Sequence, residues 1–175
     1  VTVSASLATA QAWSTNVRMP CGALGSTSGR PTSRPSANGL FRLSFADLLS
    51  IGQGGQGTLS VMTGSTVSAS HLALGAAGVL NLQGGTIQVV SASNAGTADK
   101  FNWYSGTLQY LGSTSTGDGQ LLGRSTTLAA GNRLVVNGQL TVALNNDLTL
   151  FGGTAEVAGL LVHGSVSINA FSTLA

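Results

Sequence analysis

The spacing of short apolar pairs is the feature that most constrains how this chain can fold. From Leu59 onward, pairs of apolar residues separated by one polar residue recur, and successive pairs start mostly five to eight residues apart. Gly, Asn, Ser and Asp, which tolerate left-handed turn conformations, lie between the pairs. This alternation predicts short strands with one buried face. The predicted inward pairs are Leu59/Val61, Val67/Ala69, Leu72/Leu74, Leu80/Leu82, Ile87/Val89, Leu108/Tyr110, Leu128/Ala130, Leu134/Val136, Leu140/Val142, Leu148/Leu150, Ala155/Val157 and Val166/Ile168.

The close spacing distinguishes between the possible all-β architectures. Strands of a sandwich or barrel usually recur roughly every 8–12 residues and are joined by hairpins. The apolar pairs of this chain are too close together to leave room for hairpin loops. Short strands joined by sharp corners instead let the chain wind in parallel turns. Leu59 and Leu80 are twenty-one positions apart, as are Leu134 and Ala155. We therefore predict an all-β, single-stranded parallel β-helix (β-solenoid), with about three short strands and about 20–22 residues per coil, and about six coils in residues 51–175.

One unit of this pattern occurs twice almost unchanged. The sequence NLQGGTIQV at residues 81–89 has a near-copy, TLFGGTAEV, at residues 149–157. Paired glycines often lie against ligands, but here each pair separates two short strands at a fixed place in the period. We therefore interpret Gly84 and Gly85 as a corner of the coil, and the unit as a building block rather than a binding site.

The composition supports a folded, all-β chain. Only 7% of the residues are charged, against about 25% in an average domain. Thr, Ser, Asn and Gln therefore occupy the expected exposed positions, which suits strands better than helices. The 42% hydrophobic content argues against disorder. Because the chain has no run of eighteen apolar residues, we expect no membrane-spanning helix.

Residues 1–50 depart from the pattern, and we predict an N-terminal irregular segment, a cap or assembly segment with some strand, ahead of the solenoid repeats in residues 51–175. Three prolines, Pro20, Pro31 and Pro35, interrupt it. Its four arginines are spread out without interleaved aromatic residues, so we expect no nucleic-acid binding. The stretch LFRLSFADLLSI, residues 40–51, alternates like a strand but also fits a short helix; we favour the strand.

Two turn-rich stretches interrupt the repeats, and we expect loops near residues 91–100 and 112–119. The segment between them holds four aromatic residues, Phe101, Trp103, Tyr104 and Tyr110. These residues either form a platform on which a glycan stacks, or Phe101 and Trp103 point inward as a bulky core layer with Tyr104 outward. We favour the core interpretation.

The residue types that carry chemistry do not form a catalytic or ligand-binding pattern. Glycoside hydrolysis usually needs two carboxylates that face one groove; Asp99 and Asp118 flank the aromatic segment, but each fits a solvated turn residue better. His71 and His163 have no further His or Cys at metal-ligand spacing. The glycine-rich GQGGQG at residues 52–57 lacks the helix that follows a nucleotide-binding loop. We predict no enzyme activity, no cofactor and no metal site.

The repeats resemble those of a known class of proteins. The run GTLSVMTGSTVSASHLALGAAGVLNLQGGTIQV, residues 57–89, is similar to the β-strand repeats of autotransporter-type and PEP-CTERM-associated bacterial surface proteins. The run NRLVVNGQLTVALNNDLTLFGGTAEVAGLLVHGSVSIN, residues 132–169, is similar to the same class. The resemblance implies secretion, an extracellular or cell-surface location and a role as a stalk, adhesin shaft or fibre. It transfers no catalytic residue.

Our leading hypothesis is a non-enzymatic extracellular structural protein whose subunits stack end to end into a surface filament or stalk. The final stretch, SVSINAFSTLA, keeps the strand pattern and carries no charged or helical cap. A last coil of this kind needs another coil to cover it, from further residues or from a second copy. The expected partner is the protein itself. The candidate assembly contacts are Trp13, Arg30, Arg34 and Phe171.

Two alternatives belong to other functional classes. The first is an adhesin or glycan-binding shaft that contacts a glycan or a cell surface through Tyr104, Asp99 and Asp118. The second is an enzyme resembling the β-helical polysaccharide lyases and hydrolases, with Asp99 and Asp118 as its acid pair.

Overall fold

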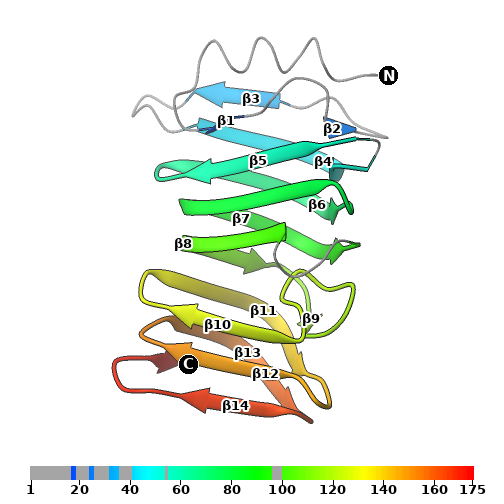
Figure 1. Ribbon diagram of the computed structural model, residues 1–175. Coiled ribbons are helices and arrows are strands. Elements are labelled where there is room, and N and C mark those ends of the chain that lie inside the picture. The colour runs from blue at the N-terminus through cyan, green and yellow to red at the C-terminus, as the bar shows by residue number, and fades with distance from the viewer. Residues whose placement is uncertain (1–16, 19–23, 26–31, 36–40, 54, 96–99) are drawn as a thin grey trace.

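The computed structural model describes residues 17–18, 24–25, 32–35, 41–53, 55–95 and 100–175. These residues form a β-solenoid of about six turns whose strands pair mainly in parallel (Figure 1). No α-helix occurs in these ranges. The parallel β-helix predicted from the spacing of the apolar pairs is therefore confirmed.

Fifteen strands lie within the described ranges, and most of them belong to a twelve-stranded sheet that winds around the solenoid. A separate three-stranded sheet has the order β10-β12-β14. The strands are β1 (Val17–Arg18), β2 (Leu24–Gly25), β3 (Thr32–Pro35), β4 (Phe41–Ile51), β5 (Gly57–Met62), β6 (Ser65–Leu74), β7 (Gly78–Asn94), β8 (Phe101–Tyr110), β9 (Thr114–Ser115), β10 (Ser125–Ala129), β11 (Asn132–Val142), β12 (Asp147–Phe151), β13 (Thr154–Val162), β14 (Ser165–Ile168) and β15 (Thr173–Leu174).

Each turn of the solenoid crosses three faces, which we number in the order that the chain follows from β5. Face 1 consists of β5, residues 78–82 of β7, residues 101–103 of β8, β10, β12 and β14. Face 2 consists of residues 41–45 of β4, 65–69 of β6, 86–89 of β7, 107–110 of β8, 132–136 of β11, 154–157 of β13, and β15. Face 3 consists of residues 48–51 of β4, 71–74 of β6, 91–94 of β7, β9, 139–142 of β11 and 159–162 of β13.

The twenty-one-residue period holds where it was measured in the sequence. Leu59 pairs with Leu80, and Leu134 pairs with Ala155, in parallel register. The predicted inward pairs form one continuous core, in which most side chains are fully buried. Ala130 is an exception: it lies in the turn after β10 and is exposed, because the strand ends one residue earlier than the alternation suggests.

The Gly-Gly unit forms the corner between faces 1 and 2. Gly84 has φ +90°, and a Cβ at Gly85 would lie 2.5 Å from the Met62 carbonyl oxygen of the preceding turn. Gly64, Gly131 and Gly152 occupy the same place in the register and also have positive φ. The unit is therefore a building block of the coil: one glycine supplies a left-handed conformation and the next allows close approach of two turns.

Strands β1, β2 and β3 pair antiparallel with the first turn, one on each face. β3 pairs with residues 41–44, β2 with residues 50–51 and β1 with residues 60–61. Because they occupy the outer hydrogen-bonding edge, these strands cap the N-terminal end of the solenoid. Residues 41–51 form strand β4, so the strand interpretation of this stretch is confirmed and the helical one is wrong.

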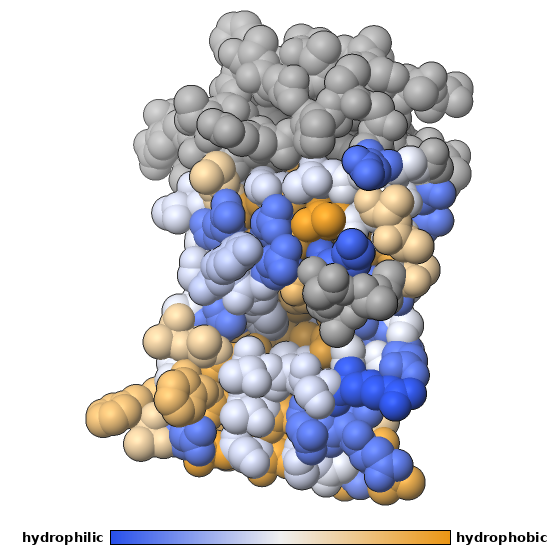
Figure 2. Space-filling view, viewed as in Figure 1, coloured by the Kyte–Doolittle hydropathy of each residue, from blue (hydrophilic) through white to orange (hydrophobic). Residues whose placement is uncertain are grey.

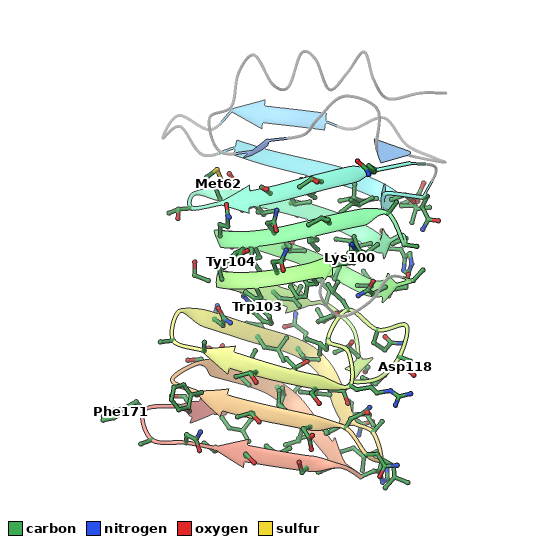
Figure 3. The ribbon with its side chains drawn as sticks, in the orientation of Figure 1. Met62, Lys100, Trp103, Tyr104, Asp118 and Phe171 are labelled. Atoms are coloured by element: carbon green, nitrogen blue, oxygen red, sulfur yellow. The ribbon has the colours of Figure 1, made fainter. Side chains whose placement is uncertain are left out.

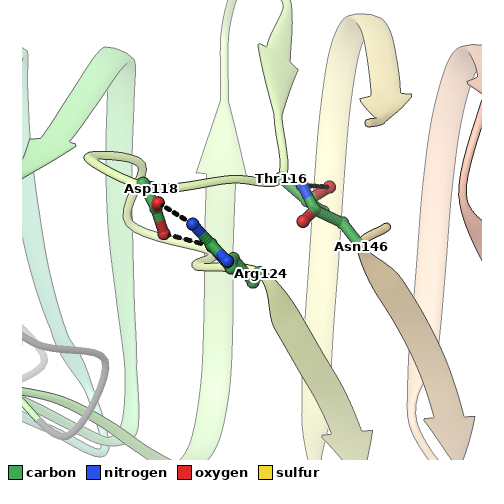
Figure 4. Close-up of polar contacts among 4 residues, drawn as sticks. All are labelled: Thr116, Asp118, Arg124 and Asn146. Atoms are coloured by element: carbon green, nitrogen blue, oxygen red, sulfur yellow. Dashed lines mark hydrogen bonds and ion pairs between the residues drawn. The ribbon is translucent and has the colours of Figure 1, made fainter. Parts of the chain in front are cut away.

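The structure differs from the prediction at both expected loops, and residues 96–99 of the first one lie outside the described residues. Residues 91–94 belong to β7, because they continue the parallel ladder with residues 71–74 of β6. Thr114 and Ser115 form β9, and the loop that follows runs from residue 116 to residue 124. Thr116 is buried and accepts a hydrogen bond from Asn146 Nδ2 at 3.2 Å (Figure 4).

The corner geometry predicts the effect of Gly85→Ala. The added methyl group would clash with backbone atoms of the preceding turn, so we expect the free energy of unfolding to fall by about 1–3 kcal/mol. Gly55→Ala is the matched control, because no atom lies within 4 Å of a Cβ at that position. Urea unfolding of the two variants measures the difference. Equal stability of both variants would contradict the tight corner.

The buried Tyr110 predicts how stability depends on alkaline pH. Burial raises the pKa of its hydroxyl, so the folded protein keeps this group neutral. An unfolded tyrosine ionises near pH 10, so above that pH Tyr110 lowers the free energy of unfolding by about 1.4 kcal/mol per pH unit.

Tyr110→Phe is expected to remove this part of the alkaline destabilisation, measured by urea unfolding between about pH 9 and about pH 12. Tyr104→Phe, at a side chain that is 63% exposed, is the control and should retain the wild-type slope. An unchanged slope in the Tyr110 variant would show that the hydroxyl reaches solvent before the protein unfolds.

Candidate functional site

The last turn of the solenoid leaves its inward side chains uncovered. Val142 is fully buried, but Val162, its partner in the next turn, is 43% exposed. Leu150 is likewise fully buried, and its partner Ile168 is 51% exposed. Figure 2 shows apolar surface at this end of the molecule. We call this surface the open end; its inward residues are Val157, Leu160, Val162, Val166, Ile168 and Leu174.

Phe171 stands beside the open end in an unusual conformation. Its φ is +66° and its side chain is 98% exposed (Figure 3). In the register of β13 and β15 it aligns with Gly152, which has the left-handed conformation of the corner. A bulky residue in this conformation is strained, and such strain is concentrated at functional positions. Phe151, next to the aligned glycine, is also 64% exposed, so this corner carries two exposed aromatic rings.

The other candidate assembly contacts lie toward the N-terminus. Trp13 and Arg30 are outside the described residues. Arg34 lies in β3, where its Cα is paired with that of Arg42 in β4. The structure thus places Arg34 in the antiparallel cap at one end and Phe171 at the opposite end of the solenoid (Figure 1).

The aromatic segment divides between the core and the surface. Phe101 and Trp103 pair in register with Leu80 and Leu82 and pack against the core, with ring centroids 5.7 Å apart. Tyr104 is 63% exposed. The core interpretation of this segment is confirmed, and a platform formed by all four aromatic residues is wrong, because successive strand residues point to opposite sides.

Amide side chains form ladders on the outer surface next to Tyr104. Asn102 Nδ2 donates to Asn81 Oδ1 at 2.8 Å, and Asn81 Nδ2 donates to Ser60 Oγ at 3.2 Å. On face 2, Gln88 Nε2 donates to Gln109 Oε1 at 3.1 Å. These bonds connect side chains at the same place in successive turns, so they reinforce the register.

Asp118 is held by Arg124 within its own loop. The Arg124 guanidinium donates two hydrogen bonds to the Asp118 carboxylate, and both side chains are largely exposed (Figure 4). The hydrogen bond from Arg124 lowers the pKa of Asp118. A carboxylate held in the ionised form is a poor proton donor for glycoside cleavage. Asp99, its proposed partner, lies outside the described residues.

Glu156 is also held by a salt bridge. Arg133 donates to Glu156 at 2.8 and 2.6 Å, and this bond lowers the pKa of the Glu156 carboxyl. The two residues lie on neighbouring turns, where Val135 is the strand partner of Glu156. This pair joins the two turns on the outer surface.

His71 lies between two serines of the next turn. Its Nδ1 is 2.8 Å from Ser91 Oγ, and its Nε2 is 3.1 Å from Ser93 Oγ. Within the described ranges, no group of three or more His, Cys, Asp or Glu residues has the arrangement of a metal site. None of the helices in that part of the chain is long and apolar enough to cross a membrane.

Sequence reasoning missed a break in face 1 between β8 and β10. Residues 101–103 have a hydrogen-bonded neighbour in β7, but β10 belongs to the separate three-stranded sheet. The sequence contained a signal for this break. β10 starts twenty-four residues after β8, which is longer than the twenty-one-residue period, and the additional residues lie in the loop 116–124.

Comparison of the chain with protein-family models, with curated proteins and with solved structures found no match. The proposals that follow therefore rest on the geometry of the described residues, together with the likeness of the repeats to those of bacterial surface proteins.

Proposed function

We propose that this protein is a non-enzymatic structural β-solenoid whose copies stack end to end, with the open end of one copy on the capped end of the next. The observation that carries this proposal is the exposure of inward residues at the open end. Each of them is the register equivalent of a core residue that is nearly fully buried one turn earlier, as Val162 is of Val142.

Apolar burial supplies the attraction in this arrangement. Full burial of one Val, Leu or Ile side chain contributes about 1.5–3 kcal/mol, and residues that are half exposed, such as Ile168, gain the corresponding fraction. The six inward residues of the open end form one continuous surface, so a single partner surface covers them together.

Backbone pairing determines the orientation of one copy relative to the next. The last described turn consists of residues 159–162 of β13, β14 and β15, and no further strand among the described residues pairs with their outer edges. At the other end, β1, β2 and β3 lie on the three faces with antiparallel polarity. Contact of these two ends therefore brings one strand edge against another on every face, and each joint leaves a new open end for the next copy.

We further propose that the protein works outside the cell as a surface filament or stalk. Its few charged residues and Thr-, Ser- and Asn-rich outer positions support this location, as does the resemblance of its repeats to bacterial surface proteins. The Arg133–Glu156 salt bridge and the amide ladders on the outer surface connect successive turns, which suits a shaft that carries load along its axis.

Ile168→Lys tests the stacking. A charge placed at the joint must be desolvated when another copy covers it, so we expect this variant to remain monomeric where the wild type assembles. Because Ile168 is 51% exposed in the single chain, the thermal stability of the monomer should change little. Ser167→Lys is the matched control: it is an adjacent, exposed position on the outer side of β14, and it should assemble normally.

Phe171→Gly is a second variant for the same measurement. Glycine relieves a left-handed conformation that costs other residues about 1–2 kcal/mol, so the folded monomer should be at least as stable as the wild type. If the phenyl ring contacts the next copy, assembly should weaken although the fold does not.

Sedimentation velocity and electron microscopy over a range of concentrations measure the outcome. Elongated particles that lengthen with concentration support the proposal. Dispersed monomers of the wild type at high concentration would overturn it. Particles that stop at two copies would show that two open ends meet each other, which contradicts end-to-end growth.

Glycan binding is a second candidate function, and the surface around Tyr104 favours it. An exposed aromatic ring beside the amides of Asn102 and Asn81 combines a stacking surface with hydrogen-bond donors and acceptors, which are the groups that recognise sugars. We expect a glycan array to give signals that Tyr104→Ala reduces at least tenfold, a loss of about 1.4 kcal/mol. Phe151→Ala, at another exposed aromatic residue, is the control. A blank array for the wild type would eliminate this candidate.

A further inference from the structure

The break in face 1 leaves two strand edges opposite each other within the body of the solenoid. On faces 2 and 3 the same two turns are joined, since β11 pairs with both β8 and β9. On face 1, no strand pairing joins residues 101–103 to β10. Figure 1 shows the wider separation of these two strands. The pairing on faces 2 and 3 therefore fixes the positions of the two unpaired edges on face 1.

The break is wider than the spacing of paired strands, as Figure 1 shows for β8 and β10. Neighbouring strands lie about 4.8 Å apart, so two strands that flank one absent strand would be about 10 Å apart. A folded element larger than a strand does not fit between edges of one sheet, whereas a single extended chain can pair with both.

The backbone groups of the two edges point into the break. The carbonyl groups of Arg124 and Leu128 bond to the β12 side, through Asp147 N at 2.8 Å and Gly153 N at 3.2 Å. Because successive residues of a strand alternate in direction, the N–H and C=O of Thr127 point toward β8. On the opposite edge, the Trp103 carbonyl accepts a bond from Asn132 Nδ2 at 3.3 Å, so Trp103 and Phe101 direct their backbone groups toward β10.

Two aromatic rings line the inner side of the break. Phe101 and Trp103 are only partly buried, whereas Leu80 and Leu82, their partners in the preceding turn, are fully buried. Figure 3 labels Trp103 beside β8 at the level of the break, and Figure 2 shows apolar surface there. An entering strand with inward apolar side chains would cover these rings as a further turn covers a leucine pair.

Cationic residues lie where both bordering strands begin. Lys100 directly precedes β8, and Arg124 directly precedes β10 and is paired with Asp118. Because the two strands run in the same direction, these side chains belong to the same end of the break. Asp99 directly precedes Lys100 in the sequence and Asp118 is paired with Arg124, so the charges near this end balance and favour neither sign on an incoming strand.

We propose that the break between β8 and β10 binds one extended peptide segment of another protein, which pairs with both edges in parallel orientation. The segment carries apolar residues at alternate positions. β12 has this pattern, with the sequence DLTLF, and it occupies the equivalent place on the other side of β10, where Asp147 pairs with Ser125. This binding is β-augmentation and does not depend on the stacking of copies.

A peptide with the sequence of residues 146–152, NDLTLFG, is the probe. In a Trp13→Phe background, Trp103 is the only tryptophan of the full-length chain. We expect the peptide to shift the Trp103 emission to shorter wavelength with saturable binding, because it removes water from the ring. The same peptide with proline in place of its threonine should not bind.

Thr127→Pro identifies the site. This change removes the N–H group that points into the break but none of the bonds to β12, and proline is tolerated at such an edge. We expect NDLTLFG to bind at least fivefold more weakly, the loss of about one backbone hydrogen bond. Thr127→Val keeps the N–H group and should bind as the wild type does. Circular dichroism and thermal unfolding confirm that both variants are folded.

Two results would overturn the proposal. One is the absence of any fluorescence change at millimolar NDLTLFG. The other is equal binding to the Thr127→Pro and Thr127→Val variants, which would place the peptide at another edge, such as the open end. Ile168→Lys distinguishes that case, because it alters the open end and leaves the break unchanged.

Discussion

The constraint on which this structure depends is that each turn must place its inward pair directly over the pair of the turn before. Parallel pairing of Leu59 with Leu80, or of Leu134 with Ala155, satisfies the backbone and the core at once. The left-handed glycine at the corner between faces 1 and 2 keeps the turns in register, because it reverses the chain in a short distance. A single short strand is not stable alone, because without its neighbours it lacks both hydrogen bonds and apolar contacts.

The two described ends of the solenoid differ. At the first turn, β1, β2 and β3 reverse direction and occupy the edge of all three faces. These strands run antiparallel to the winding of the solenoid. In the last described turn, Val162 and Ile168 keep the inward orientation of core residues but are about half exposed. The two described ends therefore present different surfaces, as head-to-tail stacking of copies requires.

The repetitive part of the fold could be predicted from the sequence, because its information is local. Alternation identifies Leu80 and Leu82 as inward residues, and periodicity identifies which leucine lies above which. The inward orientation of Phe101 and Trp103 follows from the same alternation. The shorter extent of the first loop was missed because Ser, Ala and Asn at residues 91–94 have turn character, whereas the ladder with residues 71–74 holds them in a strand. The antiparallel cap and the break in face 1 depend on pairing between distant segments, which local patterns do not encode.

The candidate sites are departures from the repeat rather than parts of it. A glycine corner that recurs along the shaft cannot by itself distinguish one place on the shaft from another, so a specific contact requires a position where the pattern changes. Phe171 stands where other turns have glycine, in a conformation that strains it and with a side chain that contributes almost nothing to the core. Phe101 and Trp103 stand where other turns have small aliphatic pairs, beside the one interruption in face 1. In both places an aromatic side chain that is at least partly exposed lies next to a strand edge without a partner among the described residues, and these two features together favour binding of another β-strand.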